Sequence, residues 1–193
     1  LRWNSTDALV NGAAAEAVLG QADFTTATSG LAANKFNNPI GVFVDAAGRL
    51  WVGDFTNNRV LRFDNAAAKA SGASADGVLG QPDFVTGTSG NTQLKASGPC
   101  GLYVDAAGRL FVSNFNNHRV LRWDDAANKP NGAAADGVHV VERRVGRVDE
   151  PFFDGSAARL KITNAPSGEN DGELLTPGRA DTRSRVPVRS VCT

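Results

Sequence analysis

Methionine is absent from the 193 residues, and only two cysteines, two histidines and one tyrosine are present. Two cysteines cannot supply the four thiolates of a structural zinc site, and Cys100 and Cys192 lie too far apart to form a motif. No apolar run approaches the roughly 18 residues that a membrane-spanning helix needs. The formal net charge is zero, and no block of like charge indicates a nucleic-acid or lipid surface.

The N-terminus offers no targeting signal. The chain opens with Leu-Arg-Trp, and no basic segment followed by an apolar stretch precedes the first repeat, so no signal peptide is visible. Because position 1 is not Met and falls inside a repeated phrase, we expect the natural N-terminus to be missing. The sequence therefore leaves the cellular compartment open.

A repeat of 60 residues is the strongest feature of the sequence. PIGVFVDAAGRLWVGDFTNNRVLRF at 39–63 matches PCGLYVDAAGRLFVSNFNNHRVLRW at 99–123 at 16 of 25 positions. The same offset aligns VLGQADF, beginning at Val18, with VLGQPDF, beginning at Val78. A single offset that serves every segment indicates tandem copies of one structural unit.

Each copy predicts four short strands. GVFVD (41–45), LWVGD (50–54) and RVLRFD (59–64) are rich in apolar residues that suit strands, and turn residues separate them. Val78-Leu79-Gly80 is the expected fourth strand, and the Ala-rich stretch at 66–70 is expected to be a loop with at most a helical turn. The strands alternate poorly between apolar and polar residues, which indicates burial on both faces. Four-stranded sheets packed between copies of themselves form a β-propeller.

These residues resemble the NHL repeat family. PIGVFVD, GRLWVGD and NNRVLRF are similar to that family's strand entry, second strand and turn into the third strand, and the VLGQxDF phrase looks like its long-repeat bacterial version. The resemblance covers residues 1–138 and implies a propeller that is usually six-bladed. The second copy departs from the family pattern because Asn114 replaces the acidic residue that Asp54 keeps.

The chain is too short to close a propeller by itself. Propellers have roughly four to eight blades, and four units of this length would exceed 193 residues. We therefore expect an all-β fragment of a propeller, with four-stranded antiparallel blades of about 60 residues and open blade faces through which it could self-associate.

The composition changes after residue 138. Residues 139–193 form an irregular tail that carries eight Arg, one Lys and four of the eight Pro. The favoured interpretation is that this tail is not the native continuation, as after a shift of reading frame near residue 138. The alternatives are a disordered extension and a small domain with strands at 138–148 and 159–163.

The candidate polar residues all have a structural interpretation beside a functional one. His118 occupies the reversal between two strands, where a turn role is favoured over metal binding, and His139 lies where the repeat breaks. Asp45 and Asp105 recur at strand ends and could form a carboxylate ring that holds a cation. We favour turn caps for both.

The repeated arginines and aromatic residues are also interpreted as structural. Structural pairing is favoured over phosphate contact because residues 1–138 carry 11 basic and 12 acidic side chains; the arginines are Arg59, Arg119, Arg62 and Arg122. Core packing is expected for the aromatic residues at repeat-equivalent positions, namely Trp3, Trp51, Trp123, Phe24, Phe63 and Phe84.

The sequence predicts no catalytic, cofactor-binding or metal-binding residue. It contains no Ser-His-Asp set, no Gly-rich phosphate loop and no Cys/His metal spacing. We expect a non-catalytic scaffold that binds a protein or a small polar ligand through loops 21–38 and 81–98. The alternatives are a fragment of a propeller lyase or hydrolase whose catalytic or metal residues lie in other blades, and, less favoured, RNA binding as in animal relatives of the family.

Overall fold

The computed structural model describes residues 1–3 and 10–140 of the chain. The expected tail, apart from the two residues after Val138, lies outside the described residues, and so does its candidate strand at 159–163. The boundary between a repeat domain and a tail therefore stays a prediction.

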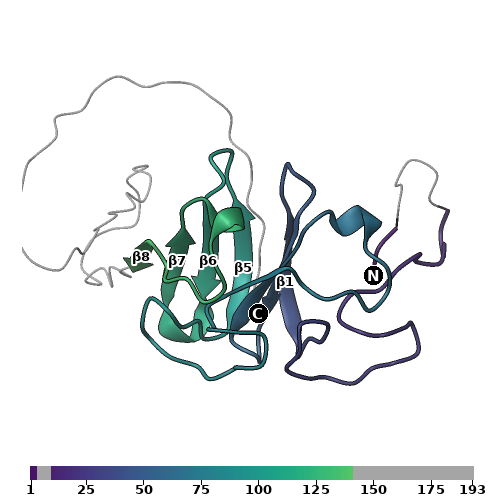
Figure 1. The fold of residues 1–193 in the computed structure, drawn as a ribbon, viewed down its shortest axis with the longest axis horizontal. Helices are drawn as coiled ribbons and strands as arrows, with labels where there is room; N and C mark the ends of the chain where they lie inside the picture. The colour runs from purple at the N-terminus through teal and green to yellow at the C-terminus, as the bar shows by residue number, and fades with distance from the viewer. Residues whose placement is uncertain (4–9, 141–193) are drawn as a thin grey trace, which may run out of the picture.

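Two four-stranded antiparallel sheets follow one another along the chain (Figure 1). Each sheet has its strands in chain order, and the part of the chain that the structure describes contains no α-helix. Sheet 1 consists of β1 (Pro39–Val44), β2 (Leu50–Asp54), β3 (Arg59–Phe63) and β4 (Gly77–Leu79). Sheet 2 consists of β5 (Pro99–Val104), β6 (Leu110–Asn114), β7 (Arg119–Trp123) and β8 (Gly137–Val140).

Short 3₁₀ turns complete each unit: η1 (Ala66–Ala68), η2 (Phe115–Asn117) and η3 (Ala126–Asn128). The predicted all-β meander of four strands and the helical turn at 66–70 are therefore confirmed. The strand after residue 137 continues two residues beyond the point where the repeated sequence is lost, because backbone pairing with β7 does not depend on the side chains.

The reversals between strands use the residues that the sequence indicates. Gly48 closes the β1–β2 turn with a φ of 73°, which an L side chain rarely adopts. Asn58 and His118 take left-handed conformations, with φ of 54° and 50°, immediately before β3 and β7. The turn role predicted for His118 is thus confirmed.

Strands β2, β3 and β4 of sheet 1 are buried on both faces by two different groups of side chains. Toward sheet 2, Trp51 and Val60 pack against residues of sheet 2 that include Leu121 and Trp123. The opposite face carries Leu61, Phe63 and Val78, which pack against Leu19 and Phe36 of the N-terminal segment, defined as residues 1–3 and 10–38. Burial on both faces explains why β2, β3 and β4 are rich in apolar residues.

Glycines let the two sheets approach closely. A Cβ atom on Gly41 would lie 1.9 Å from the carbonyl oxygen of Cys100, and one on Gly53 would lie 2.7 Å from that of Pro99. Real Cβ atoms do not come so near to backbone. The first strand of sheet 2 therefore lies directly on β1 and β2.

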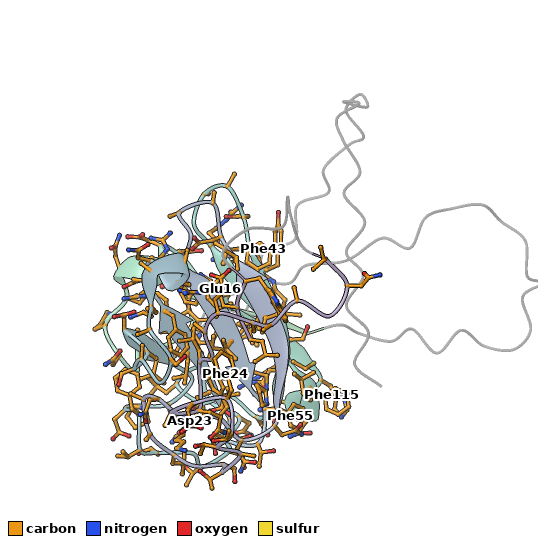
Figure 2. The ribbon with its side chains drawn as sticks, turned by 90° about the vertical axis from the view of Figure 1, so that its right-hand side faces the viewer. Glu16, Asp23, Phe24, Phe43, Phe55 and Phe115 are labelled. Carbon is orange, nitrogen blue, oxygen red and sulfur yellow. The ribbon has the colours of Figure 1, made fainter. Side chains whose placement is uncertain are left out.

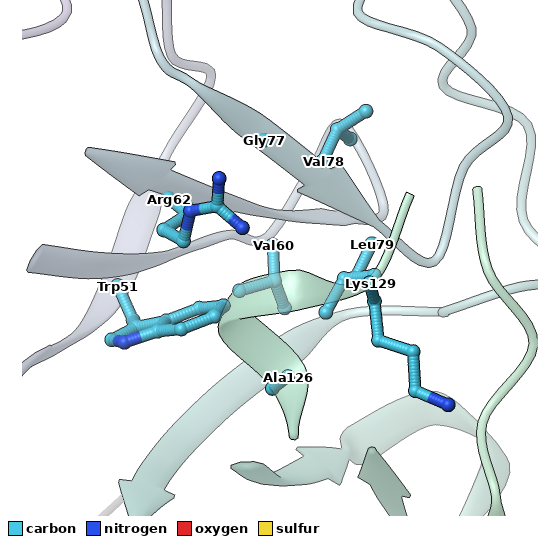
Figure 3. A pocket seen from close by; sticks show the side chains of 8 residues that line it. All are labelled: Trp51, Val60, Arg62, Gly77, Val78, Leu79, Ala126 and Lys129. Atoms are coloured by element: carbon cyan, nitrogen blue, oxygen red, sulfur yellow. The ribbon is translucent and has the colours of Figure 1, made fainter. Parts of the chain in front are cut away.

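Hydrogen bonds join the edge strand of sheet 1 to the loop that precedes β8. Val78 N–H donates to Asn131 Oδ1 at 3.0 Å, and its carbonyl accepts from Gly132 N–H at 3.1 Å. Arg62 Nη1 donates to the carbonyl of Ala127 in η3. Figure 3 shows this junction, where Arg62 and Val60 of sheet 1 face η3 across a small hollow that has no room for a water molecule.

The N-terminal segment joins sheet 1 through equivalent contacts. Val18 N–H donates to Ser71 Oγ at 3.2 Å, and its carbonyl accepts from Gly72 N–H at 3.0 Å. Arg2 pairs with Ala17, as Arg62 pairs with Gly77, and its Nη1 donates to the carbonyl of Lys69 at 2.8 Å. The N-terminal segment thus repeats some of the contacts that the outer two strands of a unit make, although it forms only an isolated β-bridge.

Two sequence predictions about burial are wrong. Trp3 and Phe24 are 39% and 53% exposed, although Trp51, Trp123 and Phe63 are in the core as expected. The strand β1 also has an exposed apolar row instead of two buried faces, at Ile40, Val42 and Val44. The reason is the same in each case. Among the described residues, no strand precedes β1 that could cover these side chains.

Candidate functional site

Two long loops lie at the same end of the two sheets. Loop 21–38 is held by Asn57, whose Nδ2 donates to the carbonyl of Gly30 at 2.9 Å. Loop 81–98 is held by Asn117 Nδ2, which donates to the carbonyl of Gly90 at 2.7 Å. Because the asparagines belong to the reversals before β3 and β7, each loop is fixed to its own rigid sheet.

A lysine closes each loop on itself. Lys35 Nζ lies 2.8 Å from Thr28 Oγ1 and 3.3 Å from Gln21 Oε1, and Gln21 Nε2 donates to the carbonyl of Thr28 at 3.0 Å. The second loop repeats all of these contacts at Lys95, Gln81 and Thr88. Each ammonium is therefore held by neutral oxygen atoms, and the two loops have a common internal frame.

An aspartate organises the tip of each loop. Asp23 Oδ1 accepts hydrogen bonds from the backbone N–H and the hydroxyl of both Thr25 and Thr26 at 2.7–2.9 Å. These bonds, above all that from the Thr26 hydroxyl, lower the pKa of Asp23 to about 2. In the second loop, hydrogen bonds led by the one from Thr86 lower the pKa of Asp83 in the same way.

A buried arginine ties both loops to sheet 1. Arg59 Nε donates to Asp54 Oδ2 at 2.7 Å, and both side chains are fully shielded from solvent. The Arg59 Nη2 atom donates to the carbonyls of Ala32 and Lys35 in the first loop, at 3.0 and 2.9 Å. Its Nη1 donates to the carbonyl of Phe84 in the second loop at 2.5 Å. One guanidinium thus positions both loops, and the structural role predicted for it is confirmed.

The equivalent position in sheet 2 lacks the carboxylate. Asn114 Oδ1 accepts from Ser97 N–H at 2.7 Å, but Asn114 Nδ2 has no partner among the described residues. Arg119 Nε also has no partner, although its other nitrogens donate to carbonyls of loop 81–98. Burial lowers the pKa of Arg119. Neither donor therefore has the carboxylate acceptor that Asp54 supplies in sheet 1.

Asp45 and Asp105 cap turns at the opposite end of the sheets. Asp45 Oδ1 accepts from the N–H groups of Ala47 and Arg49, while Oδ2 accepts from Arg49 Nε at 2.7 Å and Trp51 Nε1 at 3.0 Å. Asp105 makes the equivalent bonds within its own turn. Burial acts to raise the pKa of Asp45, but the bonds from Trp51 and Arg49 outweigh it and lower that pKa. The predicted turn caps are confirmed.

The remaining candidate residues from the sequence are Arg62, Arg122 and His139. Arg62 and Arg122 pair with Asp64 and Asp124, with Nε–Oδ1 distances of 2.9 Å. His139 lies in β8 opposite Val120 of β7, at the position that Leu79 has in sheet 1.

Two exposed aromatic rings, Phe24 and Phe115, and the half-buried ring of Phe55 lie at the loop end. Phe55 and Phe115 lie side by side with their ring centroids 6.1 Å apart, while Phe24 lies beside Asp23 on the first loop (Figure 2). The ring of Phe55 rests on the backbone of Gly98, and Phe115 is 51% exposed. These rings give the loop end an apolar surface beside its polar side chains.

Sequence reasoning missed the residues that hold the loops. Lys35, Gln21 and the Asp54–Arg59 pair were not assigned to the loop frame, although Lys35 and Gln21 recur at the 60-residue offset as Lys95 and Gln81. That recurrence was the available signal. Within residues 1–3 and 10–140, no group of three His, Cys, Asp or Glu side chains is placed to hold a metal ion. No helix there has the length and apolarity to span a membrane.

Comparison with known families finds one match, which covers most of the first unit. The NHL repeat model matches residues 36–63, the end of loop 21–38 followed by β1, β2 and β3. Residues 36–63 are therefore similar to an NHL repeat. This agrees with the resemblance that the sequence suggested, and NHL repeats form the blades of propellers. The curated proteins contain no match to the chain.

Proposed function

We propose that the chain is part of a β-propeller and acts as a non-catalytic binding scaffold. The supporting observation is the common frame of the two long loops, in which the same Lys–Gln–Thr contacts recur at Lys35 and Lys95. Loops on a rigid scaffold are the usual binding elements of such folds. Because the loops are already ordered before a partner binds, less conformational entropy is lost on binding.

The ligand is a protein segment or a small polar molecule. The loop tips carry Thr hydroxyls and backbone amides beside the exposed rings of Phe24 and Phe115, which suits a partner that has both polar and apolar groups. The near balance of charge over residues 1–138 disfavours nucleic acid, whose binding depends on neutralised phosphates.

The test is to map binding by NMR while a library of peptides and sugars is titrated into the full chain. A ligand should shift amide signals of Thr26, Thr86 and Phe115 and leave the turns at 45–48 and 105–108 unchanged. Thr26→Ala and Thr86→Ala should weaken binding without loss of the β circular-dichroism signal. Ala46→Ser in the opposite turn is the matched control. Shifts confined to the Asp45 and Asp105 turns would contradict the proposal.

A further inference from the structure

Asn131 and Gly132 form a chemically reactive dipeptide in the loop that joins sheet 1 to the strand β8. They lie in a turn that is closed by a 3.1 Å hydrogen bond from Ala133 N–H to the carbonyl of Pro130, and Gly132 has a φ of 74°. In an Asn-Gly sequence the glycine nitrogen can attack the amide carbon of the asparagine, because glycine has no side chain to hinder the approach. Asn131 is exposed, so water can reach the product of such an attack.

Both reacting groups are held by one residue of sheet 1. Val78 N–H donates to Asn131 Oδ1 at 3.0 Å, and the Val78 carbonyl accepts from Gly132 N–H at 3.1 Å. The first bond fixes the amide group that would be attacked, and the second retains the proton that the glycine nitrogen must lose. A hydrogen-bonded amide releases its proton when the structure opens locally. The closed junction should therefore suppress the reaction, and an open junction should allow it.

The equivalent turn of the first unit makes the same contacts without a reactive amide. Ser71 Oγ accepts from Val18 N–H at 3.2 Å, and Gly72 N–H donates to the Val18 carbonyl at 3.0 Å. A serine is therefore sufficient for the hydrogen bonds of this position. The reactivity of the Asn131 amide is an additional property of the second turn.

The backbone at Gly132 is packed too closely to change its path. A Cβ atom on Gly132 would lie 2.7 Å from Cα of Pro82 and 3.1 Å from the Pro82 carbonyl oxygen, at the start of loop 81–98. An isoaspartyl residue at position 131 would route the backbone through its side chain and so lengthen the backbone by a methylene group. Gly132 would then be displaced relative to Pro82 and Val78, and the paired bonds to Val78 could not both re-form.

We propose that Asn131 is a modification site, where opening of the junction permits spontaneous deamidation and the isoaspartyl product keeps the junction from closing again. The Gly132 nitrogen loses its proton to solvent and forms a bond to Cγ of Asn131. The Cγ–Nδ2 bond breaks, and Nδ2 takes a proton from water and leaves as ammonia. A water molecule then opens the cyclic imide at either carbonyl, which gives aspartate or isoaspartate. The amide is hydrolysed without any oxidation or reduction, and the chain gains a negative charge.

The first test compares the rate at Asn131 in the full chain with the rate in a peptide of residues 129–135, which has no junction. Both are kept in mildly alkaline buffer, and mass spectrometry follows the mass gain at Asn131 as a carboxyl group replaces the amide. The folded chain should react at least about tenfold more slowly than the peptide. The chain unfolded in guanidinium chloride should react as fast as the peptide. Equal rates in the folded and unfolded chain would overturn the proposal.

The second test loosens the junction by substitution. Arg62→Ala removes the bond from Arg62 Nη1 to the Ala127 carbonyl and should raise the deamidation rate of Asn131 toward that of the peptide. Arg109→Ala is the matched control, because it removes an ion pair in a turn of sheet 2 and should leave the rate unchanged. An unchanged rate in the Arg62 variant would contradict gating by the junction.

The third test measures the consequence of the modification. In the isoaspartyl chain, separated by chromatography, hydrogen exchange of the Val78 amide should be at least about tenfold faster than in the unmodified chain. Asn131→Asp adds the same charge without a longer backbone, and Asn131→Ser copies the contacts of Ser71; both should keep the slow exchange. Slow exchange in the isoaspartyl chain, or fast exchange in the Asp variant, would overturn the proposed effect of the longer backbone. None of these measurements depends on ligand binding by the loops, so this proposal and the loop titration fail separately.

Discussion

Asp54 and Arg59 form an ion pair that is fully buried at the loop end of sheet 1, with 2.7 Å between Oδ2 and Nε. The pair is completed by Asn57 Nδ2, which donates to Asp54 Oδ2 at 2.8 Å, and by Asn37 N–H, which donates to Oδ1 at 2.7 Å. Because the arginine also bonds carbonyls of both long loops, this pair couples the fold of the sheet to the shape of the candidate binding surface.

Asp54→Asn should destabilise the protein strongly. The substitution leaves the Arg59 guanidinium buried without a counter-charge, and the loss of one partner of a buried pair costs about 3–5 kcal/mol. The midpoint of urea unfolding should fall accordingly, and the NMR signals of loop 21–38 should broaden. A loss below about 1 kcal/mol would show that the pair does not hold the loops.

Asn114→Asp should have the opposite effect. It converts the site in sheet 2 into that of sheet 1 and gives Arg119 Nε the acceptor that it lacks. Hydrogen bonds to charged groups contribute about 1.5–3 kcal/mol, and the partial exposure of Arg119 reduces this, so a gain of about 1 kcal/mol is expected. Urea unfolding at neutral pH measures it. Asn116→Asp, on the exposed reversal, is the control that adds the same charge without a buried arginine.

The sequence predicted the strands better than the site, for physical reasons. β2 and the reversals at 45–48 and 55–58 follow from local apolar runs and turn residues, which act over a few positions. Arg59 of the Asp54–Arg59 pair contacts loop residues that are 24 to 27 positions away in the sequence, and no local pattern encodes such a contact. The exposure of Trp3, Phe24 and Val42 depends on whether a neighbouring unit covers them. Equivalent positions in a repeat can differ in this respect, so the repeated sequence does not predict it.

Acid should loosen the tip of the first loop before the sheets unfold. The pKa of Asp23 is about 2 in the folded chain, against about 3.9 for an unperturbed aspartate. The carboxylate therefore stabilises the tip fully above about pH 4, and this contribution is lost as the pH falls through about 2. NMR titration of the Thr25 and Thr26 amides should show a midpoint near that value.

Thr26→Val tests the origin of this low pKa. The hydroxyl of Thr26 is the largest contributor, so its removal should move the Asp23 midpoint upward while the backbone bonds remain. Thr28→Val, in the same loop but bonded to Lys35, should leave the midpoint in place. An unchanged midpoint in the Thr26 variant would assign the low pKa to the backbone N–H groups instead.

Gly41→Ala should separate the two sheets, whereas the same change at the equivalent Gly101 should be tolerated. A Cβ on Gly41 would meet the backbone carbonyl of Cys100 at 1.9 Å, and β5 cannot retreat without breaking its contacts with β1 and β2. A Cβ on Gly101 would meet Ser113 Oγ at 2.9 Å, which can rotate away, and Ser113 Cβ at 3.5 Å, which is an ordinary van der Waals contact. We expect a loss of about 3 kcal/mol for the first variant and less than about 1 kcal/mol for the second. Thermal unfolding monitored by the emission of buried Trp51 and Trp123 measures both. Equal losses would mean that the close approach of β5 to β1 does not set the packing of the sheets.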